Sequence, residues 1–326
     1  MSVTIKDIAK KAGVSYSTVS KALRNSPLVK KPTKIKIKEI AEQLGYQPNA
    51  AARSLVQKKS YTVGVIWPTV ERVAPSILIT KLNELLEEHS YTTLLSINKV
   101  DQAIATFNRF QVDAIIVFGE LDNVQELSLA STVPILHYGV QTLKDALTID
   151  VNRQYAIKLG VTHLKELGHE HIAFIGDQSK ENTLQRAKLV GFLEGMGLNE
   201  KSEIEKLVIP TNGLELHDGY MAAKQLFERQ SNISAVISGS YDLTRGILRA
   251  ANEFEYNVPK HFSIVSYDNI PQSEDLHIEL TTVGVPISRI ASEITKCVLT
   301  MIESKEPTRS VVLEPEININ ESTRKI

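Results

Sequence analysis

The stretch that most constrains this chain is VTIKDIAKKAGVSYSTVSKALRNSP, which runs from Val3 to Pro27. Thr4 stands three residues before an acidic residue, which is the spacing of a capped helix start. Apolar residues then recur at helical spacing, and Gly13 can end the helix because it has no Cβ. Ser15 can cap a second helix that follows at once. The stretch therefore predicts two short helices joined by a tight turn.

The second of these helices has one apolar side and one polar side. Val19, Ala22 and Leu23 form the apolar side. Polar and basic residues face outward and gather toward the N-terminal end of the helix, and they are Tyr16, Ser17, Ser20, Lys21 and Arg24. In a helix-turn-helix this end of the second helix enters the major groove of DNA. A third amphipathic helix is expected from about Thr33 to just before Gly45.

The charges of the chain are divided unevenly between two segments. Residues 1–60 contain 13 Lys and Arg against three acidic residues, which gives a formal charge of +10. The remaining residues contain 24 basic and 35 acidic groups, which gives −11. A basic N-terminal segment followed by an acidic remainder is the distribution expected when only the first segment meets polyphosphate. The charge pattern thus favours a DNA-binding head and a separate body.

Two strings, TIKDIAKKAGVSYSTVSKAL and AEQLGYQPNAAARSL, resemble the start of the lactose/galactose repressor (LacI/GalR) family of bacterial transcription factors. The resemblance implies a sequence-specific DNA-binding regulator, in most relatives a repressor, and no enzymatic activity. It also implies a homodimer on a pseudo-palindromic operator in double-stranded DNA, controlled by a small-molecule effector such as a sugar or sugar derivative. Further assembly of dimers and a co-repressor protein stay open, because no segment of the sequence indicates either.

The resemblance also implies which residues contact DNA. The family's base-reading positions are occupied by Tyr16, Ser17 and Lys21, the last in place of the usual Arg. The residues expected to contact phosphates or support the hinge are Thr4, Ser15, Thr18, Ser20 and Asn49. The Ala-rich segment at about 49–56 resembles the family's hinge helix, in which Leu55 would open a base step and Ala52 would allow close approach. Alternatively, Leu55 packs on the body.

From Tyr61 onward, short apolar runs alternate with longer amphipathic segments. This alternation favours doubly wound parallel sheets, and about 260 residues suit two such sheets with a cleft between them. The expected strands are 62–67, 92–97, 114–118, 133–138, 172–176, 206–209, 235–238 and 263–267. The expected helices include 77–89, 152–167, 183–196, 216–229 and 243–254.

The predicted fold is a small all-α helix-turn-helix head, residues 1–60, and an α/β body, residues 61–326. By resemblance, the two doubly wound parallel-sheet lobes of the body are similar to periplasmic sugar-binding proteins, with three crossings between lobes. The lobe near DNA is expected at about 61–167 and 281–305. The distal lobe is expected at about 168–280 and 311–319.

Four residues of the body are candidates for effector binding. Asp268 matches the Asp that the family offers to its ligand, and a carboxylate that accepts hydroxyl hydrogen bonds suits sugars. Lys188 falls where the family has an Arg clamp. Trp67 could stack on a sugar ring at the cleft mouth or belong to the core, and Ser240 lies where the family usually shows a ligand-contacting Asn-Asp pair.

Several classes of protein are disfavoured by what the sequence lacks. It contains no Gly-rich phosphate loop, no nucleophile elbow and no metal pair at ligand spacing, so neither an enzyme nor a cofactor is expected. Cys297 is the only cysteine, which excludes an internal disulfide. No apolar run approaches the roughly 18 residues of a membrane span, so a cytoplasmic location is expected. The alternatives are a sequence-indifferent DNA-binding protein and a sugar-binding protein without a regulatory role.

Overall fold

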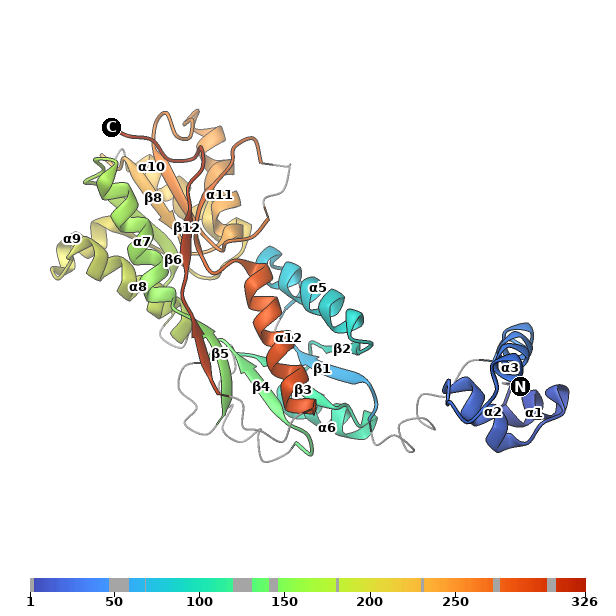
Figure 1. The fold of residues 1–326 in the computed structure, drawn as a ribbon. Helices are drawn as coiled ribbons and strands as arrows, with labels where there is room; N and C mark the ends of the chain where they lie inside the picture. Colours follow the sequence, from blue (N-terminus) through green and yellow to red (C-terminus); the bar gives the residue numbers. More distant parts are fainter. Residues whose placement is uncertain are drawn as a thin grey trace. The chain divides into compact units, whose positions relative to one another are not determined.

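The computed structural model divides into two compact units, Met1–Ser60 and Tyr61–Ile326, which we call the head and the body (Figure 1). It describes residues 3–46, 59–67, 69–119, 131–140, 146–179, 182–229, 232–271, 276–303 and 309–326. Asn49, Ala52 and Leu55, together with the expected hinge helix, lie outside these ranges. Within the described ranges, no helix is long and apolar enough to cross a membrane.

The head is a bundle of three helices, α1 (Ile5–Ala12), α2 (Tyr16–Leu23) and α3 (Lys31–Gln43). Its core consists of one apolar stripe from each helix, including Ile8, Val19 and Ile37. The expected helix-turn-helix is confirmed, since Gly13 ends α1 in the left-handed conformation and the Ser15 side chain accepts a hydrogen bond at the start of α2. The third helix starts two residues earlier than expected because a proline is tolerated in its first turn, where no amide needs a partner.

The body contains two six-stranded sheets. The first has the order β11-β5-β4-β3-β1-β2 and is parallel throughout. The second has the order β12-β10-β9-β8-β6-β7 and is parallel except for β12. The strands of the first sheet are β1 (Thr62–Ile66), β2 (Thr92–Ser96), β3 (Ala114–Phe118), β4 (Ile135–Tyr138), β5 (Leu147–Val151) and β11 (Val311–Leu313). Those of the second are β6 (Ile172–Asp177), β7 (Val208–Thr211), β8 (Ala235–Ser238), β9 (Ser263–Tyr267), β10 (Thr281–Gly284) and β12 (Glu316–Asn318).

Helices pack on both sheets. Lobe 1 is the first sheet with α5 (Val73–Glu88), α6 (Val100–Phe110) and α12 (Ile287–Glu303). Lobe 2 is the second sheet with α7 (Arg153–Glu166), α8 (Thr183–Met196), α9 (Lys201–Leu207), α10 (Leu216–Glu228) and α11 (Tyr241–Glu253). Figure 1 shows α12, near the end of the chain, lying beside α5 in lobe 1.

Burial on both faces explains why the strands are apolar rather than alternating. One cluster covers the α5 and α12 face of the first sheet and continues to the α10 and α11 face of the second. Smaller clusters lie between the first sheet and α6 and between the second sheet and α7 and α8. Every residue of β3 and β9 is buried, as expected for central strands of a parallel sheet.

The crossings between lobes differ from the expected boundaries. Helix α7 packs on the second sheet, so the first crossing lies between β5 and α7 and not near residue 167. Strand β10 pairs with β9, so Thr281–Gly284 belongs to lobe 2 and the second crossing follows it. Residues 311–319 were expected wholly in the distal lobe, but β11 joins the first sheet and β12 joins the second. The prediction failed because strand pairing, which assigns a segment to a sheet, leaves little signal in sequence.

Two local assignments also need correction. The expected strand at 206–209 begins instead at Val208, because Lys206 and Leu207 complete helix α9. Helix α5 starts at Val73, four residues before the expected start. The sequence at this start, Val-Ala-Pro-Ser, places proline in the first turn, where a helix accepts it. Sequence periodicity is weakest at such ends, where few residues of the apolar stripe are present.

Two helices of lobe 2, α10 and α11, cross so closely that glycines are required at the contact. A Cβ on Gly246 would overlap the carbonyl oxygen of Leu216 and the amide nitrogen of Tyr220. Backbone atoms cannot move away as a flexible side chain could. We expect Gly246→Ala to lower the free energy of unfolding by about 1–3 kcal/mol in urea titrations. Asn252→Ala, on the exposed side of the same helix, should change it by less than about 0.5 kcal/mol; equal effects would contradict the close crossing.

Candidate functional site

One polar face of α2 is the first candidate site. Tyr16 is 55% exposed, and Ser17 and Lys21 are also exposed on this helix. The buried side of α2 is held by Val19 and Ala22, both fully enclosed in the head core. The core therefore orients all three predicted base-reading side chains toward solvent.

Hydroxyl groups at the start of α2 already form a network. The Ser15 hydroxyl lies 2.9 Å from that of Ser17 and 2.8 Å from that of Thr18, and it accepts from the Thr18 amide at 3.2 Å. Ser20 is held by Arg24, whose guanidinium donates to its carbonyl and hydroxyl oxygens at 3.1 and 3.2 Å. These bonds fix the positions of the polar groups that we expected to contact phosphates.

Thr4 has a structural partner. Its amide and its hydroxyl both donate to one carboxylate oxygen of Asp7, at 2.8 and 2.7 Å. These bonds lower the pKa of Asp7, so the carboxylate stays charged at the positive end of α1. Thr4 is exposed, so a phosphate contact is sterically open to it.

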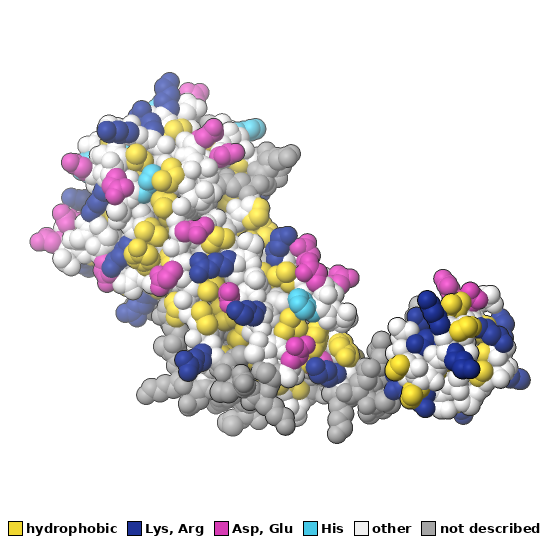
Figure 2. All heavy atoms as spheres, in the orientation of Figure 1, with side chains coloured by type: hydrophobic (Ala, Val, Ile, Leu, Met, Phe, Trp, Pro, Cys, Tyr) yellow, Lys and Arg dark blue, Asp and Glu magenta, His cyan; other side chains and the backbone are white. Residues whose placement is uncertain are grey.

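Two lysines of α3 bind backbone carbonyls of the helix-turn-helix. Lys36 donates to the carbonyl of Ala12 at 3.2 Å, at the end of α1, and Lys34 donates to the carbonyl of Asn25 at 3.0 Å. Both therefore tie α3 to the helix-turn-helix. Figure 2 shows many Lys and Arg side chains over the visible face of the head, with few acidic ones.

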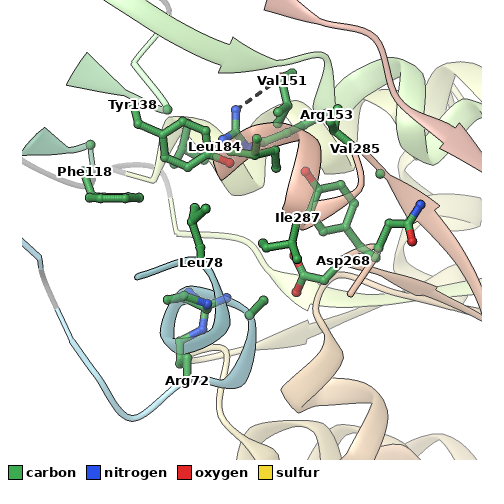
Figure 3. Close-up of a pocket in the computed structure, with 18 of the residues that line it drawn as sticks. Arg72, Leu78, Phe118, Tyr138, Val151, Arg153, Leu184, Asp268, Val285 and Ile287 are labelled. Carbon is green, nitrogen blue, oxygen red and sulfur yellow. Dashed lines mark hydrogen bonds between the residues drawn. The ribbon is translucent and has the colours of Figure 1, made fainter. Parts of the chain in front are cut away.

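The second candidate site is a pocket between the lobes of the body, with an empty volume of about 870 Å³ including its mouth (Figure 3). Lobe 1 and its crossings contribute Trp67, Thr69, Arg72, Ala74, Pro75, Leu78, Phe118, Gly119, Tyr138, Gly139, Val151, Val285, Ile287 and Ile290. Lobe 2 contributes Arg153, Leu184, Gln185, Lys188, Tyr267, Asp268, Asn269 and Gly284. The pocket thus receives mostly apolar and aromatic residues from lobe 1 and most of its polar side chains from lobe 2.

Asp268 lines this pocket just after β9. Its backbone has φ +89°, a conformation that residues other than glycine rarely adopt. The conformation is held by the Asp268 amide, which donates to the carbonyl of Val283 at 3.2 Å, and by its carboxylate, which accepts from the Tyr241 amide at 3.1 Å. A backbone held in this way is frequent at ligand-binding sites.

Lys188 also lines the pocket and is almost fully buried, with 3% of its surface exposed. Its ammonium donates to the carbonyl of Gly239 at 2.7 Å and lies 3.6 Å from the ring centroid of Tyr267. A cation over an aromatic face is stabilised electrostatically. Lys188 therefore contributes a fixed positive charge beside Asp268 and its neighbours.

Trp67 belongs to the core and also lines the pocket, and its stacking on a sugar ring stays a prediction. It is 3% exposed and packs edge-on against Phe118 in the core, yet it also lines the pocket. Its indole nitrogen has no hydrogen-bond partner among the described residues. A buried donor of this kind is costly unless a ligand or water meets it.

Ser240 is not brought to the pocket, and the expectation of a ligand contact there is corrected. It is fully buried and caps α11, accepting from the Leu243 amide at 3.2 Å and donating to the carbonyl of Leu214 at 3.4 Å. Ser240 is the N-cap of α11, and its hydroxyl is bonded to backbone groups at and near this helix start.

Sequence reasoning missed a buried ion pair in the pocket wall. Arg153, the first residue of α7, donates to the carboxylate of Asp150 and, at 3.3 Å, to the carbonyl of Val151 (Figure 3). Both charged side chains are buried. A basic residue at a helix start is usually predicted to lie at the surface. The burial of Arg153 is therefore known only from the packing of α7 against lobe 2.

Tyr138 is a further pocket residue that the sequence did not single out. Burial raises its pKa to about 12, so the hydroxyl stays protonated and can donate or accept a hydrogen bond. No group of His, Cys, Asp and Glu that could hold a metal occurs among the described residues. The pocket offers a ligand aromatic faces, buried charged groups and a hydroxyl partner.

Comparisons with known proteins cover both units. Residues 4–49 match the family of bacterial regulatory proteins called the lacI family, and residues 161–323 match the periplasmic binding protein-like domain. The catabolite control protein A of Staphylococcus xylosus is 32% identical over 302 residues, covering 90% of each chain. That of Priestia megaterium is 28% identical, covering 99% of this chain and all of the relative. The probable transcriptional repressor ExuR of Bacillus subtilis is 27% identical, covering 99% of each.

Solved structures share the fold. The lac repressor dimer bound to operator and an anti-inducer matches with a TM-score of 0.86 at 22% identity, covering 99% of this chain and all of that one. A regulator from Enterococcus faecium with bound ribose matches with a TM-score of 0.72 at 21% identity, covering 81% and 99%. The expected head and doubly wound lobes are thereby confirmed.

The buried Asp150–Arg153 pair should be more costly to break than to replace. We expect Arg153→Met to lower the free energy of unfolding by about 3–5 kcal/mol, because it leaves a buried carboxylate without its partner. The double variant Asp150→Asn, Arg153→Met removes both charges and should recover at least half of that loss in urea titrations. If the double variant lost the sum of the two single losses, the two side chains would not act as a pair.

Proposed function

Since the chain belongs to the LacI family of bacterial regulatory proteins, we propose that its head reads a specific operator under the control of a ligand in the inter-lobe pocket. The protein is a DNA-binding transcriptional regulator and not an enzyme. The observation that carries the proposal is the exposed polar face of α2 on a basic helical head, joined in one chain to a pocketed body. A repressor role agrees with the relatives named as repressors.

The DNA-binding mode that we propose uses two heads. One α2 helix reaches few base pairs, too few to select a site in a genome, so two copies must act together. The two-fold symmetry of a homodimer then predicts a pseudo-palindromic operator. The lac repressor, which shares the fold, is a dimer bound to its operator. Tyr16, Ser17 and Lys21 would read bases, and Ser15, Thr18, Ser20 and Thr4 would contact phosphates.

The ligand that we propose is a sugar or a sugar derivative. Asp268 offers a carboxylate to hydroxyl groups, Lys188 offers a buried positive charge, and aromatic residues such as Trp67 and Tyr138 offer faces for a sugar ring. Relatives of the same fold have been solved with ribose and with cellobiose. Ligand binding would change the spacing of the lobes and release DNA, so we expect induction. We place the protein in the cytoplasm, where bacterial operator DNA lies.

Lys21 should contribute to sequence selection. An operator would first be selected from random duplexes on the full-length protein. We expect Lys21→Ala to weaken binding to that operator by about 10-fold or more, and binding to random DNA much less, because one base contact is worth about 1–3 kcal/mol. Titrations at one fixed salt concentration measure both affinities.

Lys38→Ala is the matched control for Lys21→Ala, since Lys38 is exposed on α3 and not on the reading helix. It should reduce both affinities slightly and by the same factor. Equal losses on operator and random DNA for Lys21→Ala would exclude base reading by Lys21. An operator-to-random ratio near one for the unaltered protein would favour a sequence-indifferent DNA-binding protein.

Asp268 should be needed for ligand binding. A thermal-shift screen of the full-length protein against sugars, sugar acids and sugar phosphates should yield a stabilising compound, since a ligand at about 100 times its Kd adds about 2.7 kcal/mol. We expect Asp268→Ala to weaken that compound about 10- to 100-fold by titration calorimetry. Asp218→Ala, which removes a carboxylate from the start of α10, should leave the affinity unchanged. Equal loss in both variants would place the ligand elsewhere.

A further inference from the structure

A carboxylate of lobe 2 holds the first turn of a helix of lobe 1. Asp242, the second residue of α11, is 5% exposed, and its Oδ2 accepts from the backbone amide of Val73 at 3.1 Å. Val73 is the first residue of α5. Because α5 belongs to lobe 1 and α11 to lobe 2, this bond joins the two lobes.

The charge of Asp242 is compensated mainly from lobe 1. The start of α5 is the positive end of the dipole of that helix. Arg72 precedes this turn, and Arg245 lies 4.0 Å from the other carboxylate oxygen. Burial and the negative charge of Asp268 raise the pKa of Asp242, whereas the Val73 amide and the two arginines oppose that rise. Separation of the lobes would deprive the carboxylate of the α5 amide.

The residue before Asp242 is bonded to a carboxylate of the pocket. The amide of Tyr241 donates to the carboxylate of Asp268 at 3.1 Å, and Asp268 lines the pocket. The dipeptide Tyr241-Asp242 therefore binds the pocket carboxylate with its backbone and the opposite lobe with its side chain. This makes a continuous path of hydrogen bonds from Asp268 to α5.

The far end of this path also borders the pocket. Thr69, Arg72, Ala74 and Pro75, which surround the start of α5, all line it, and Figure 3 shows Arg72 at this helix turn. A ligand in the pocket therefore lies against both ends of the path. The Asp268 carboxylate can accept from the Tyr241 amide and from a ligand hydroxyl at the same time, so a bound hydroxyl would share this carboxylate with α11.

We propose that Asp242 is a positioning residue that transmits ligand occupancy at Asp268 to α5, and so sets the spacing of the lobes. This inference rests on the proposed function, in which the pocket binds a regulatory ligand. When a ligand binds the Asp268 carboxylate, the carboxylate shifts together with the Tyr241 amide that it holds, and the Asp242 side chain moves relative to Val73. Lobe 1, which directly follows the head in sequence, then changes its position relative to lobe 2.

Hydrogen exchange on the full-length protein tests the contact without ligand or DNA. We expect Asp242→Ala to speed amide exchange about tenfold in peptides covering residues 70–78 and 268–271, because the bond that protects the start of α5 is lost. Asp242→Asn keeps an acceptor oxygen for the Val73 amide, so it should restore most of the protection. If Asp242→Ala does not fold, Asp242→Asn still tests whether this side chain protects the start of α5.

Asp218→Ala is the matched control because Asp218 accepts from the Glu215 amide at 2.9 Å within lobe 2 only. It removes a helix-capping carboxylate in the same way, but should leave exchange at the start of α5 unchanged. Equal exchange at residues 70–78 in Asp242→Ala and Asp218→Ala would overturn the inference.

A second measurement tests the transmission. A panel of glucose, ribose, cellobiose, glucuronate and glucose 6-phosphate is added to the unaltered protein on its selected operator. For a compound that changes operator affinity, Asp242→Ala should bind it within about threefold of the unaltered protein, yet lose most of the change in operator affinity. An undiminished change would overturn the inference. Failure of the unaltered protein to bind any duplex would instead reject the proposed function, and the exchange experiment would still decide whether Asp242 holds α5.

Discussion

Burial of both faces of two parallel sheets is the constraint on which the body depends. Helices cover each face, and the largest apolar cluster continues from one lobe into the other. In doubly wound sheets of this kind, ligands bind beyond the carboxyl ends of the strands. Trp67, Phe118 and Tyr138 lie at or just after the ends of β1, β3 and β4, and Asp268 follows β9. The pocket is therefore a consequence of the layer architecture and not an addition to it.

The same architecture makes the interface between the lobes suitable for a switch. The chain crosses between the lobes at β5–α7, β10–α12 and β11–β12, and in the proposed mechanism the lobes change their spacing at these three connections. Near the pocket, the bond from Val73 to Asp242 joins the two lobes. Energy released by ligand binding can act on such a bond directly, since the pocket and the bond share the Asp268–Tyr241 contact.

The head follows a different rule. Its three short helices cannot be stable alone, so capping groups and a small core must act together. Asp7 and Ser15 hold the helix starts, Gly13 permits the turn, and Lys36 binds the carbonyl at the end of α1. Because these internal contacts fix α2, its exposed polar side chains are not needed for the stability of the head and can serve the DNA recognition that we propose. Rigid presentation of this kind reduces the entropy lost when the helix meets DNA.

The sequence alone determined the elements whose signal is local. Caps, helical periodicity and apolar runs predicted the three head helices and most strands, and the family resemblance predicted Asp268 and Lys188 as pocket residues. Only the tertiary structure decided which sheet receives α7, β10 and β11, that Ser240 is consumed by a helix start, and that Arg153 and Asp150 meet in the pocket wall. These outcomes depend on pairing between residues distant in sequence or on burial after packing. Neither long-range pairing nor burial after packing produces a periodic pattern of residues in the sequence.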